Sequence, residues 1–219
     1  MSMALVDFGS IGEDVVFSPV RANGVEPDLI RKAKNGDLRA FNELVRMYQH
    51  LAYRVAFRVL GDADAASDAT QDALTAAYRN IRTLRGDSLR GWLLRIVTNT
   101  CYQQLRKKRR QRETSLDAFG ADEEQAGMDL PDRLAESPHD HAERRELNEA
   151  IQDGLARLPF EQRVTLILAD IEEYSYEQVA EITQANIGTV KSRLARGRAG
   201  LRDHLRARQV LTSAQYHVG

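Results

Sequence analysis

Apolar residues recur every three or four positions along most of this 219-residue chain, and this spacing constrains the fold more than any other feature. Such spacing gives a helix one buried stripe, whereas a half-buried strand would alternate apolar and polar residues. No strand-like alternation occurs, so the sequence predicts an all-α fold. The longest stripe consists of Phe41, Leu44, Val45, Tyr48, Leu51, Ala52, Val55 and Val59.

Capping residues divide the first half of the chain into four helices. Asp37 and Asp62 are good N-caps for the second and third helices, and Gly61 separates the two. Ser88 is positioned to cap a fourth. Four helices with short connections predict one compact bundle over residues 26–112.

Residues 141–208 predict a second helical domain that contains a helix-turn-helix. Ser175 and Gln178 form a capping box that starts a short helix. A three-residue turn follows, and Asn186 can cap a longer basic helix. A short helix, a tight turn and a longer helix in this order are typical of a helix-turn-helix.

Three residues of this unit oppose the expected local structure. If Gln184 adopts a positive φ in the turn, it costs stability that glycine would not. Gly197 and Gly200 lie inside the last helix, and each costs up to about 1 kcal/mol relative to alanine. We therefore expect the last helix to fray beyond Arg196.

The charges are segregated, although the totals of 31 Lys+Arg and 32 Asp+Glu nearly balance. Residues 85–112 contain nine bases and one acid, residues 113–149 twelve acids and three bases, and residues 188–208 seven bases and one acid. Two basic blocks separated by an acidic stretch indicate two polyanion-binding surfaces, although any one run also fits a solvated helix face.

Composition also predicts three segments without a fold of their own. Residues 113–140 are acidic, contain glycine and proline and have no sustained apolar stripe, so we expect a flexible linker. Residues 1–25 predict a mobile N-terminal arm, and residues 209–219 a C-terminal tail.

The basic helix that ends the helix-turn-helix carries the first candidate DNA-binding face. A helix of this width fits the major groove, where side chains near its N-terminus meet base edges and flanking bases meet phosphates. The alternative is an αα-hairpin with a basic solvent face. The candidate residues are Thr189, Lys191, Ser192, Arg193, Arg196 and Arg198.

Two further polar faces occur in the first bundle. On the fourth helix, a basic and amide-bearing face suits single-stranded DNA, because amides can bond base edges and guanidinium groups can hold phosphates. On the third helix, a mostly acidic stripe lies opposite a row of alanines, and by itself it fits a solvated helix face. The fourth-helix face and the loop before it comprise Arg85, Arg95, Asn99, Gln103, Arg106 and Lys107, and the acidic stripe comprises Asp64, Asp68, Gln71 and Asp72.

Several of these segments resemble the extracytoplasmic-function sigma factors of bacterial RNA polymerase. Residues 176–182 (YEQVAEI) and 188–196 (GTVKSRLAR) closely resemble region four of that family. Residues 64–79, and 84–88 with 92–99, are similar to its region two. The resemblance extends from about Glu26 to Arg208 with the two regions in the family's order.

The resemblance implies a function for each face. The acidic stripe would bind a coiled coil of the β′ subunit of core RNA polymerase. The β subunit is also an implied partner. The loop at Arg85 and the fourth helix would take the melted non-template strand of the minus-10 element, and the helix-turn-helix would read the minus-35 element. Promoter DNA and an anti-sigma factor are the other implied partners, and a stress-responsive regulon the implied target.

Other function classes find little support in the sequence. No Gly-rich phosphate loop or nucleophile motif occurs, so we expect neither an enzyme nor a cofactor. His139-Asp140-His141 fits a solvated loop better than a metal site. Cys101 is the only cysteine, so no disulfide can form within the chain. The sequence also has no apolar run of membrane-spanning length and no secretory signal. These features together favour a cytoplasmic protein without membrane insertion.

Two alternatives to a polymerase subunit stay open from the residues alone. One is a free-standing DNA-binding regulator with a helical sensor domain, which would bind duplex DNA but not polymerase. The other is an interaction scaffold whose basic helices are only solvated, which would bind no specific nucleic acid. A pull-down of core polymerase separates a polymerase subunit from both alternatives, because only the subunit would retain polymerase.

Overall fold

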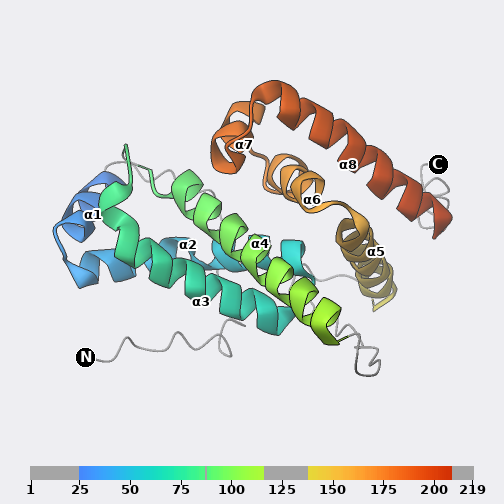
Figure 1. Cartoon of the computed structure of the whole chain (residues 1–219), viewed down its shortest axis with the longest axis horizontal. Helices are drawn as coiled ribbons and strands as arrows, with labels where there is room; N and C mark the ends of the chain where they lie inside the picture. The colour runs from blue at the N-terminus through green and yellow to red at the C-terminus, as the bar shows by residue number, and fades with distance from the viewer. Residues whose placement is uncertain (1–24, 87, 116–137, 209–219) are drawn as a thin grey trace.

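The computed structural model describes residues 25–86, 88–115 and 138–208, and every regular element in these ranges is helical (Figure 1). The predicted all-α fold with two helical domains is confirmed. The first domain contains α1 (Val25–Lys34), α2 (Leu38–Leu60), α3 (Ala63–Asn80), the 3₁₀ turn η2 (Ile81–Thr83) and α4 (Arg90–Ser115). The second contains α5 (Pro138–Arg157), α6 (Phe160–Leu166), the π-helical segment η3 (Ile167–Ile171), α7 (Tyr176–Thr183) and α8 (Ile187–Ala207).

The starts of α2 and α3 follow the sequence signals closely. The Asp37 carboxylate accepts hydrogen bonds from the backbone N–H groups of Arg39 (2.9 Å) and Ala40 (3.2 Å). Asp62 accepts from Ala65 N–H at 2.7 Å, directly after Gly61, which has a φ of 75°. These carboxylates satisfy N–H groups that the first turn of a helix leaves unpaired.

The start of α4 differs from the prediction. We expected Ser88 to cap this helix, but α4 begins at Arg90. The N–H group of Leu89 donates to the buried carboxylate of Glu26 at 2.7 Å, so a side chain from α1 serves the start of α4. The sequence could not show this bond, because it joins residues 63 positions apart.

The core of the first domain lies between α2, α3 and α4. Leu44, Val55 and Val59 of α2 are fully buried, as are Leu94, Val97 and Cys101 of α4. The third helix contributes small side chains that let it approach both neighbours closely. These are Ala66, Ala69, Ala73 and Ala77.

Glycines of the second domain mark where its helices pack most closely. A Cβ atom on Gly200 of α8 would lie 2.7 Å from Cδ2 of Leu158, and one on Gly197 would lie 3.3 Å from the carbonyl oxygen of Gln162. The expectation that α8 frays beyond Arg196 is wrong, since the helix continues to Ala207. Close packing against α5 and α6 compensates for the low helix propensity of glycine.

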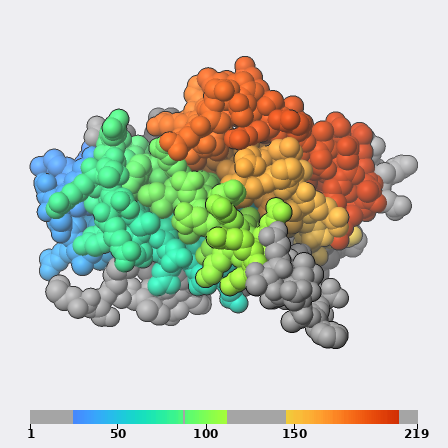
Figure 2. Space-filling model, in the orientation of Figure 1, coloured from blue at the N-terminus to red at the C-terminus, as the bar shows by residue number. Residues whose placement is uncertain are grey.

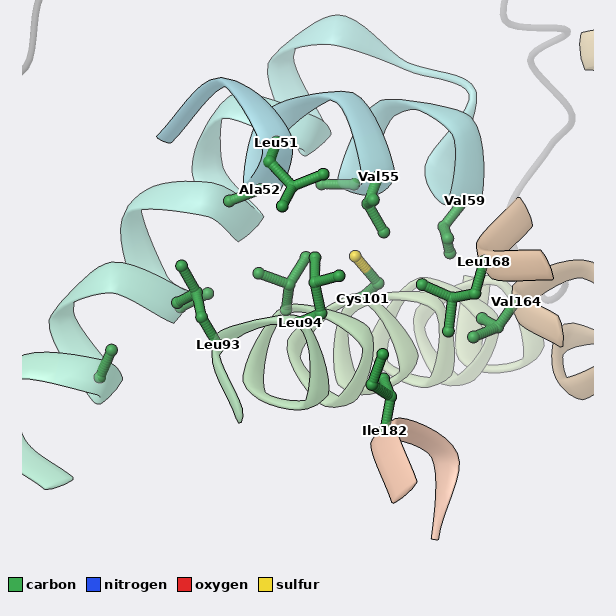
Figure 3. Close-up of a cluster of buried hydrophobic side chains, with 14 of the residues drawn as sticks. Leu51, Ala52, Val55, Val59, Leu93, Leu94, Cys101, Val164, Leu168 and Ile182 are labelled. Carbon is green, nitrogen blue, oxygen red and sulfur yellow. The ribbon is translucent and has the colours of Figure 1, made fainter. Parts of the chain in front are cut away.

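The two domains pack against each other and share one continuous apolar core. Figure 3 shows Val164, Leu168 and Ile182 of the second domain beside α4 and the end of α2, where Val59 lies. In the space-filling view the α7–α8 unit sits directly on the first domain (Figure 2). The sequence predicted the two domains but contained no signal that they dock.

The described helices extend slightly past the predicted domain limits of 112 and 141, since α4 ends at Ser115 and α5 begins at Pro138. The predicted N-terminal arm, most of the acidic linker and the C-terminal tail lie outside the described residues.

Candidate nucleic-acid interface

Helices α7 and α8 form the helix-turn-helix that the sequence predicts. The capping box is present at the start of α7, where Ser175 Oγ accepts from Gln178 N–H (3.3 Å) and Gln178 Oε1 accepts from Ser175 N–H (2.9 Å). Asn186 Oδ1 accepts from Thr189 N–H at 2.7 Å and so caps α8. Buried Val179 and Val190 supply the apolar contact between the two helices.

The turn between these helices contains the strain that the sequence suggested. Gln184 has a φ of 53° and a ψ of 37°, the left-handed conformation in which glycine is favoured. The N–H group of the next residue, Ala185, donates to the carbonyl oxygen of Ala180 at 3.0 Å. The conditional expectation about this position is therefore met.

The outer face of α8 presents most of its candidate DNA contacts to solvent. Lys191, Ser192 and Arg196 are exposed, and Thr189 and Arg193 are half-buried. Arg198 is exposed too, but its guanidinium group forms a two-point ion pair with Asp170 of η3, at 2.8 Å and 2.6 Å. Hydrogen bonds to the Asp170 carboxylate raise the pKa of Arg198. The Arg198 side chain is thus held by its own domain.

The candidate face of α4 lies beside the second domain. Asn99, Gln103, Arg106 and Lys107 are exposed, and Arg95 is half-buried. Asn99 and Tyr102 line a hollow of about 240 Å³ together with Phe160 and Ile182 of the second domain. Arg193 of α8 lines the same hollow. The structure therefore brings the candidate single-strand face and one residue of the candidate major-groove face together.

The loop before α4 contains the remaining basic candidate of this domain. Arg85 is exposed, and the adjacent Gly86 has a φ of 84°. A side chain at Gly86 would be strained in this conformation. The glycine therefore lets the chain turn sharply between η2 and α4.

The acidic stripe lies on α3, and α4 lies between α3 and the second domain (Figure 1). All four of its members are exposed, whereas the alanines on the opposite side of the helix are buried. The stripe therefore forms one open surface, made by Asp64, Asp68, Gln71 and Asp72.

The polar contacts between the domains were not predicted from the sequence. The buried Glu172 carboxylate accepts two hydrogen bonds from Arg54 of α2, at 2.8 Å and 2.6 Å, which raise the pKa of Arg54. The guanidinium group of Arg90 lies 4.7 Å above the ring of Tyr174, whose pKa burial raises to about 12. Arg54 and Glu172 are 118 positions apart, and nothing in either local sequence marks them as partners.

Burial raises the pKa of the Cys101 thiol to about 12. Within 25–86, 88–115 and 138–208, no three His, Cys, Asp or Glu side chains gather as metal ligands would. None of the helices described is both long enough and apolar enough to cross a lipid bilayer.

Comparison with known families supports the division into two regions. The family described as Sigma-70 region 2 matches residues 44–111, which include α3 and most of α4. The family described as Sigma-70, region 4 matches residues 148–201, which include the helix-turn-helix. Together these matches cover more than half of the chain.

Individual relatives agree with this assignment. The chain is 34% identical to ECF RNA polymerase sigma factor SigW of Bacillus subtilis (strain 168) over 181 residues, which is 81% of this chain and 95% of SigW. It is 32% identical to the ECF RNA polymerase sigma-E factor of Escherichia coli (strain K12) over 175 residues, 79% of this chain and 90% of that protein.

A solved structure extends the likeness to three dimensions. The sigma factor RpoE from Bartonella quintana, crystallised in complex with the anti-sigma factor NepR, superposes with a TM-score of 0.62 at 26% identity. The superposition covers 77% of this chain and 98% of that structure. From both family matches, the similarity to whole relatives and the shared fold, it follows that the chain belongs to the ECF sigma factors of bacterial RNA polymerase.

Proposed function

We propose that this sigma factor joins core RNA polymerase, recognises the minus-35 and minus-10 elements of a promoter and initiates transcription of a specific regulon. The observation that carries the proposal is the presence of three separate polar faces on one fold. They are the acidic stripe of α3, the basic and amide-bearing face of α4, and the basic face of α8. A free-standing DNA-binding regulator would need no exposed acidic stripe beside its DNA-binding faces.

The α3 stripe serves as the polymerase contact in this proposal. Its carboxylates are exposed on a rigid helix whose other side is packed with alanines, so the spacing of the charges is fixed. Clustered carboxylates of this kind fit a basic surface on the β′ subunit, and they would repel DNA. Asp64, Asp68, Gln71 and Asp72 are the proposed contacts.

The α4 face serves as the site for the melted strand of the minus-10 element. Asn99 and Gln103 are exposed one turn apart and can bond the edges of unpaired bases. Arg95, Arg106 and Lys107, with Arg85 from the preceding loop, can hold the phosphates. In this proposal Asn99 reads the base sequence, and Arg106 adds affinity for DNA of any sequence by holding phosphates.

The α8 face serves as the reader of the minus-35 element. Lys191, Ser192 and Arg193 lie within the first two turns of α8, where a recognition helix meets base edges in the major groove. Thr189 and Arg196 extend this face along the helix. Because Arg198 is paired with Asp170, its proposed contact with DNA requires that it give up part of that ion pair.

Partner, target and location follow from the same proposal. The likeness to a sigma factor bound by NepR supports control of this chain by an anti-sigma factor, and the family favours a stress-responsive regulon. Because its proposed partners are polymerase and the chromosome, the chain would act in the cytoplasm. Its proposed role is to position polymerase on the promoter, and this role needs no catalytic group or cofactor in the chain itself.

Reconstitution with core polymerase tests the proposal. The purified chain should co-elute with core polymerase and enable run-off transcription from a subset of genomic fragments that core polymerase alone does not transcribe. A free-standing regulator would bind duplex fragments without retaining polymerase, and a scaffold would do neither. Failure to retain core polymerase would overturn the proposal.

A further inference from the structure

The short helix α1 packs at the end of the bundle where η2 follows α3 (Figure 1). Ile30 and Ala33 hold it against the bundle, since both side chains are almost fully buried. Hydrogen bonds join its two ends to the two sides of the loop that carries Arg85. None of the three polar faces described above includes a residue of α1, so the role of this helix is a separate question.

Glu26, near the start of α1, bonds to the start of α4. It is buried, and its carboxylate accepts a hydrogen bond from the N–H group of Leu89 at 2.7 Å. The carbonyl oxygen of Leu89 accepts from Leu93 N–H, so Leu89 is the N-cap residue of α4. In a capping box, the third residue of the helix supplies a Glu or Gln side chain for the N–H group of the N-cap, but in α4 that residue is Trp92. Glu26 therefore supplies from α1 a bond that α4 cannot supply itself.

The Glu26 carboxylate is held in place by more than this one bond. Tyr48 of α2 is half-buried, and burial together with a hydrogen bond to Glu26 raises the pKa of Tyr48. A buried carboxylate is costly unless it is hydrogen-bonded, and one beside a helix N-terminus is favoured by the helix dipole. Glu26 thus joins α1, α2 and α4 and forms a rigid support for the start of α4.

The other end of α1 supports the other side of the same loop. The carbonyl oxygen of Lys34, in the last turn of α1, accepts a hydrogen bond from Nε of Arg82 in η2 at 3.2 Å. Leu84, which follows η2, and Leu89, which precedes α4, are both buried. The chain is therefore anchored on both sides of Arg85, by buried leucines and by bonds to α1.

A fixed loop shape favours the binding of one strand at two places. Arg85 is exposed on the loop, and Arg95 and Asn99 lie on the helix that follows it. These residues are proposed to hold the same melted strand, so their spacing has to match it. A loop that already has its bound shape loses no further conformational entropy when the strand binds, whereas a loose loop does and binds more weakly.

We propose that Glu26 is a positioning residue for the melted strand: from α1 it fixes the start of α4, so that the loop presents Arg85 to the strand that the α4 face binds. The contact between Arg82 and Lys34 supports the other side of the loop. Because Glu26 is buried, it acts through the groups that it holds and not by touching DNA. The inference rests on the proposed function of α4.

Two variants of Glu26 separate its hydrogen bond from its charge. Glu26→Gln keeps an oxygen that can accept from the Leu89 N–H group, whereas Glu26→Leu has no acceptor. Asp37→Ala is the control, because it removes the cap of another helix in the same domain. Circular dichroism checks that each variant is folded. Hydrogen exchange of the Leu89 amide, relative to the core amides of α3, reports on the bond independently of DNA.

We expect the Leu89 amide to exchange about tenfold faster in Glu26→Leu than in the wild-type chain, since local opening no longer breaks a hydrogen bond. Exchange should stay within about threefold of wild type in Glu26→Gln and should be unchanged in Asp37→Ala. Unchanged exchange in Glu26→Leu would show that α1 does not hold the start of α4, and it would overturn the inference.

A double-mutant cycle tests whether Glu26 places Arg85. The protein is the holoenzyme formed with core polymerase, and core polymerase alone gives the background. The probe is the set of oligonucleotides that wild-type holoenzyme enriches from a randomised single-stranded pool. Arg85→Ala and Arg106→Ala are each combined with Glu26→Leu. Arg106 lies in the second half of α4, so its contact with DNA should not depend on Glu26.

We expect Arg85→Ala to weaken binding by about fivefold in the wild-type background and by less than about twofold beside Glu26→Leu, because a misplaced arginine has little left to lose. Arg106→Ala should weaken binding by the same factor in both backgrounds, and Glu26→Gln should behave as wild type. Equal losses from Arg85→Ala in both backgrounds, or no loss in either, would overturn the positioning role. If wild-type holoenzyme enriches no oligonucleotide over core polymerase, the proposed function of α4 is contradicted, while the exchange of Leu89 still decides whether α1 holds the loop.

Discussion

Helices α3 and α4 are neighbours in one bundle, yet their outer faces have different surroundings. The acidic stripe of α3 is open to solvent, whereas the basic face of α4 lies beside the second domain and shares a hollow with it. The residues of both faces are exposed, apart from half-buried Arg95 of α4. The difference shows that the second domain borders the α4 face without covering it.

The largest expected effect concerns the acidic stripe of α3. Asp68→Lys with Asp72→Lys reverses two exposed charges, and we expect it to weaken binding to core polymerase by at least 100-fold, because attraction becomes repulsion. Glu43→Lys, an exposed reversal on α2, should leave binding unchanged. Titration with labelled core polymerase checks both, and circular dichroism checks that helicity is kept. Unchanged affinity in the double variant would remove α3 from the interface.

A second prediction separates two arginines of α8 that differ in their partners. Arg193→Ala should weaken recognition of the upstream promoter element by about 1–3 kcal/mol, as expected for an arginine that contacts bases. Arg198→Ala should have a smaller effect on DNA, because Arg198 is already paired with Asp170. Binding to duplex and to pre-melted promoter templates should be measured for each holoenzyme. If Arg193→Ala weakens binding to both templates equally, the assignment of Arg193 to the upstream element is wrong.

A third prediction compares two exposed residues on the α4 face. Asn99→Ala should change sequence preference at the downstream element with a modest loss of general affinity. Arg106→Ala should weaken binding to all sequences and reduce the slope of log affinity against log salt by about 1, since one phosphate contact is lost. Salt titrations on a panel of single-stranded oligonucleotides distinguish the two. The reverse pattern would show that the face is correct and the roles are exchanged.

The smallest expected effect concerns the opposite, bundle-facing side of α4. The Cys101 thiol is fully buried, and burial raises its pKa to about 12. Because the thiolate is the reactive form, Cys101 should react with a thiol reagent at pH 8 only when the bundle unfolds. Ser192→Cys on the exposed face of α8 supplies a reactive control. Rapid modification of native Cys101 would show that α4 does not pack as described.

Local chemistry explains which parts of the structure could be predicted. The caps at Asp37, Asp62 and Asn186 and the capping box at Ser175 follow from short-range bonds between near neighbours in sequence. Helical periodicity likewise placed the acidic stripe on the solvent side of α3, because its alanines must face inward.

Long-range contacts explain what could not be predicted. The capping role of Glu26 and the pairing of Arg54 with Glu172 depend on how the chain closes on itself. The continuation of α8 through Gly197 and Gly200 depends on helices that pack against it, so propensity alone gave the wrong answer. The hollow between α4 and the second domain also depends on long-range contacts, since no local sequence pattern indicates that the two domains dock.

Hydroxyl-radical footprinting with and without core polymerase tests the assignment of α3 to the polymerase interface most directly. Tyr78 of α3 is 37% exposed in the free chain. On adding polymerase we expect Tyr78 to become protected, because polymerase binds α3. No change at Tyr78 would show that α3 is not the surface that polymerase binds.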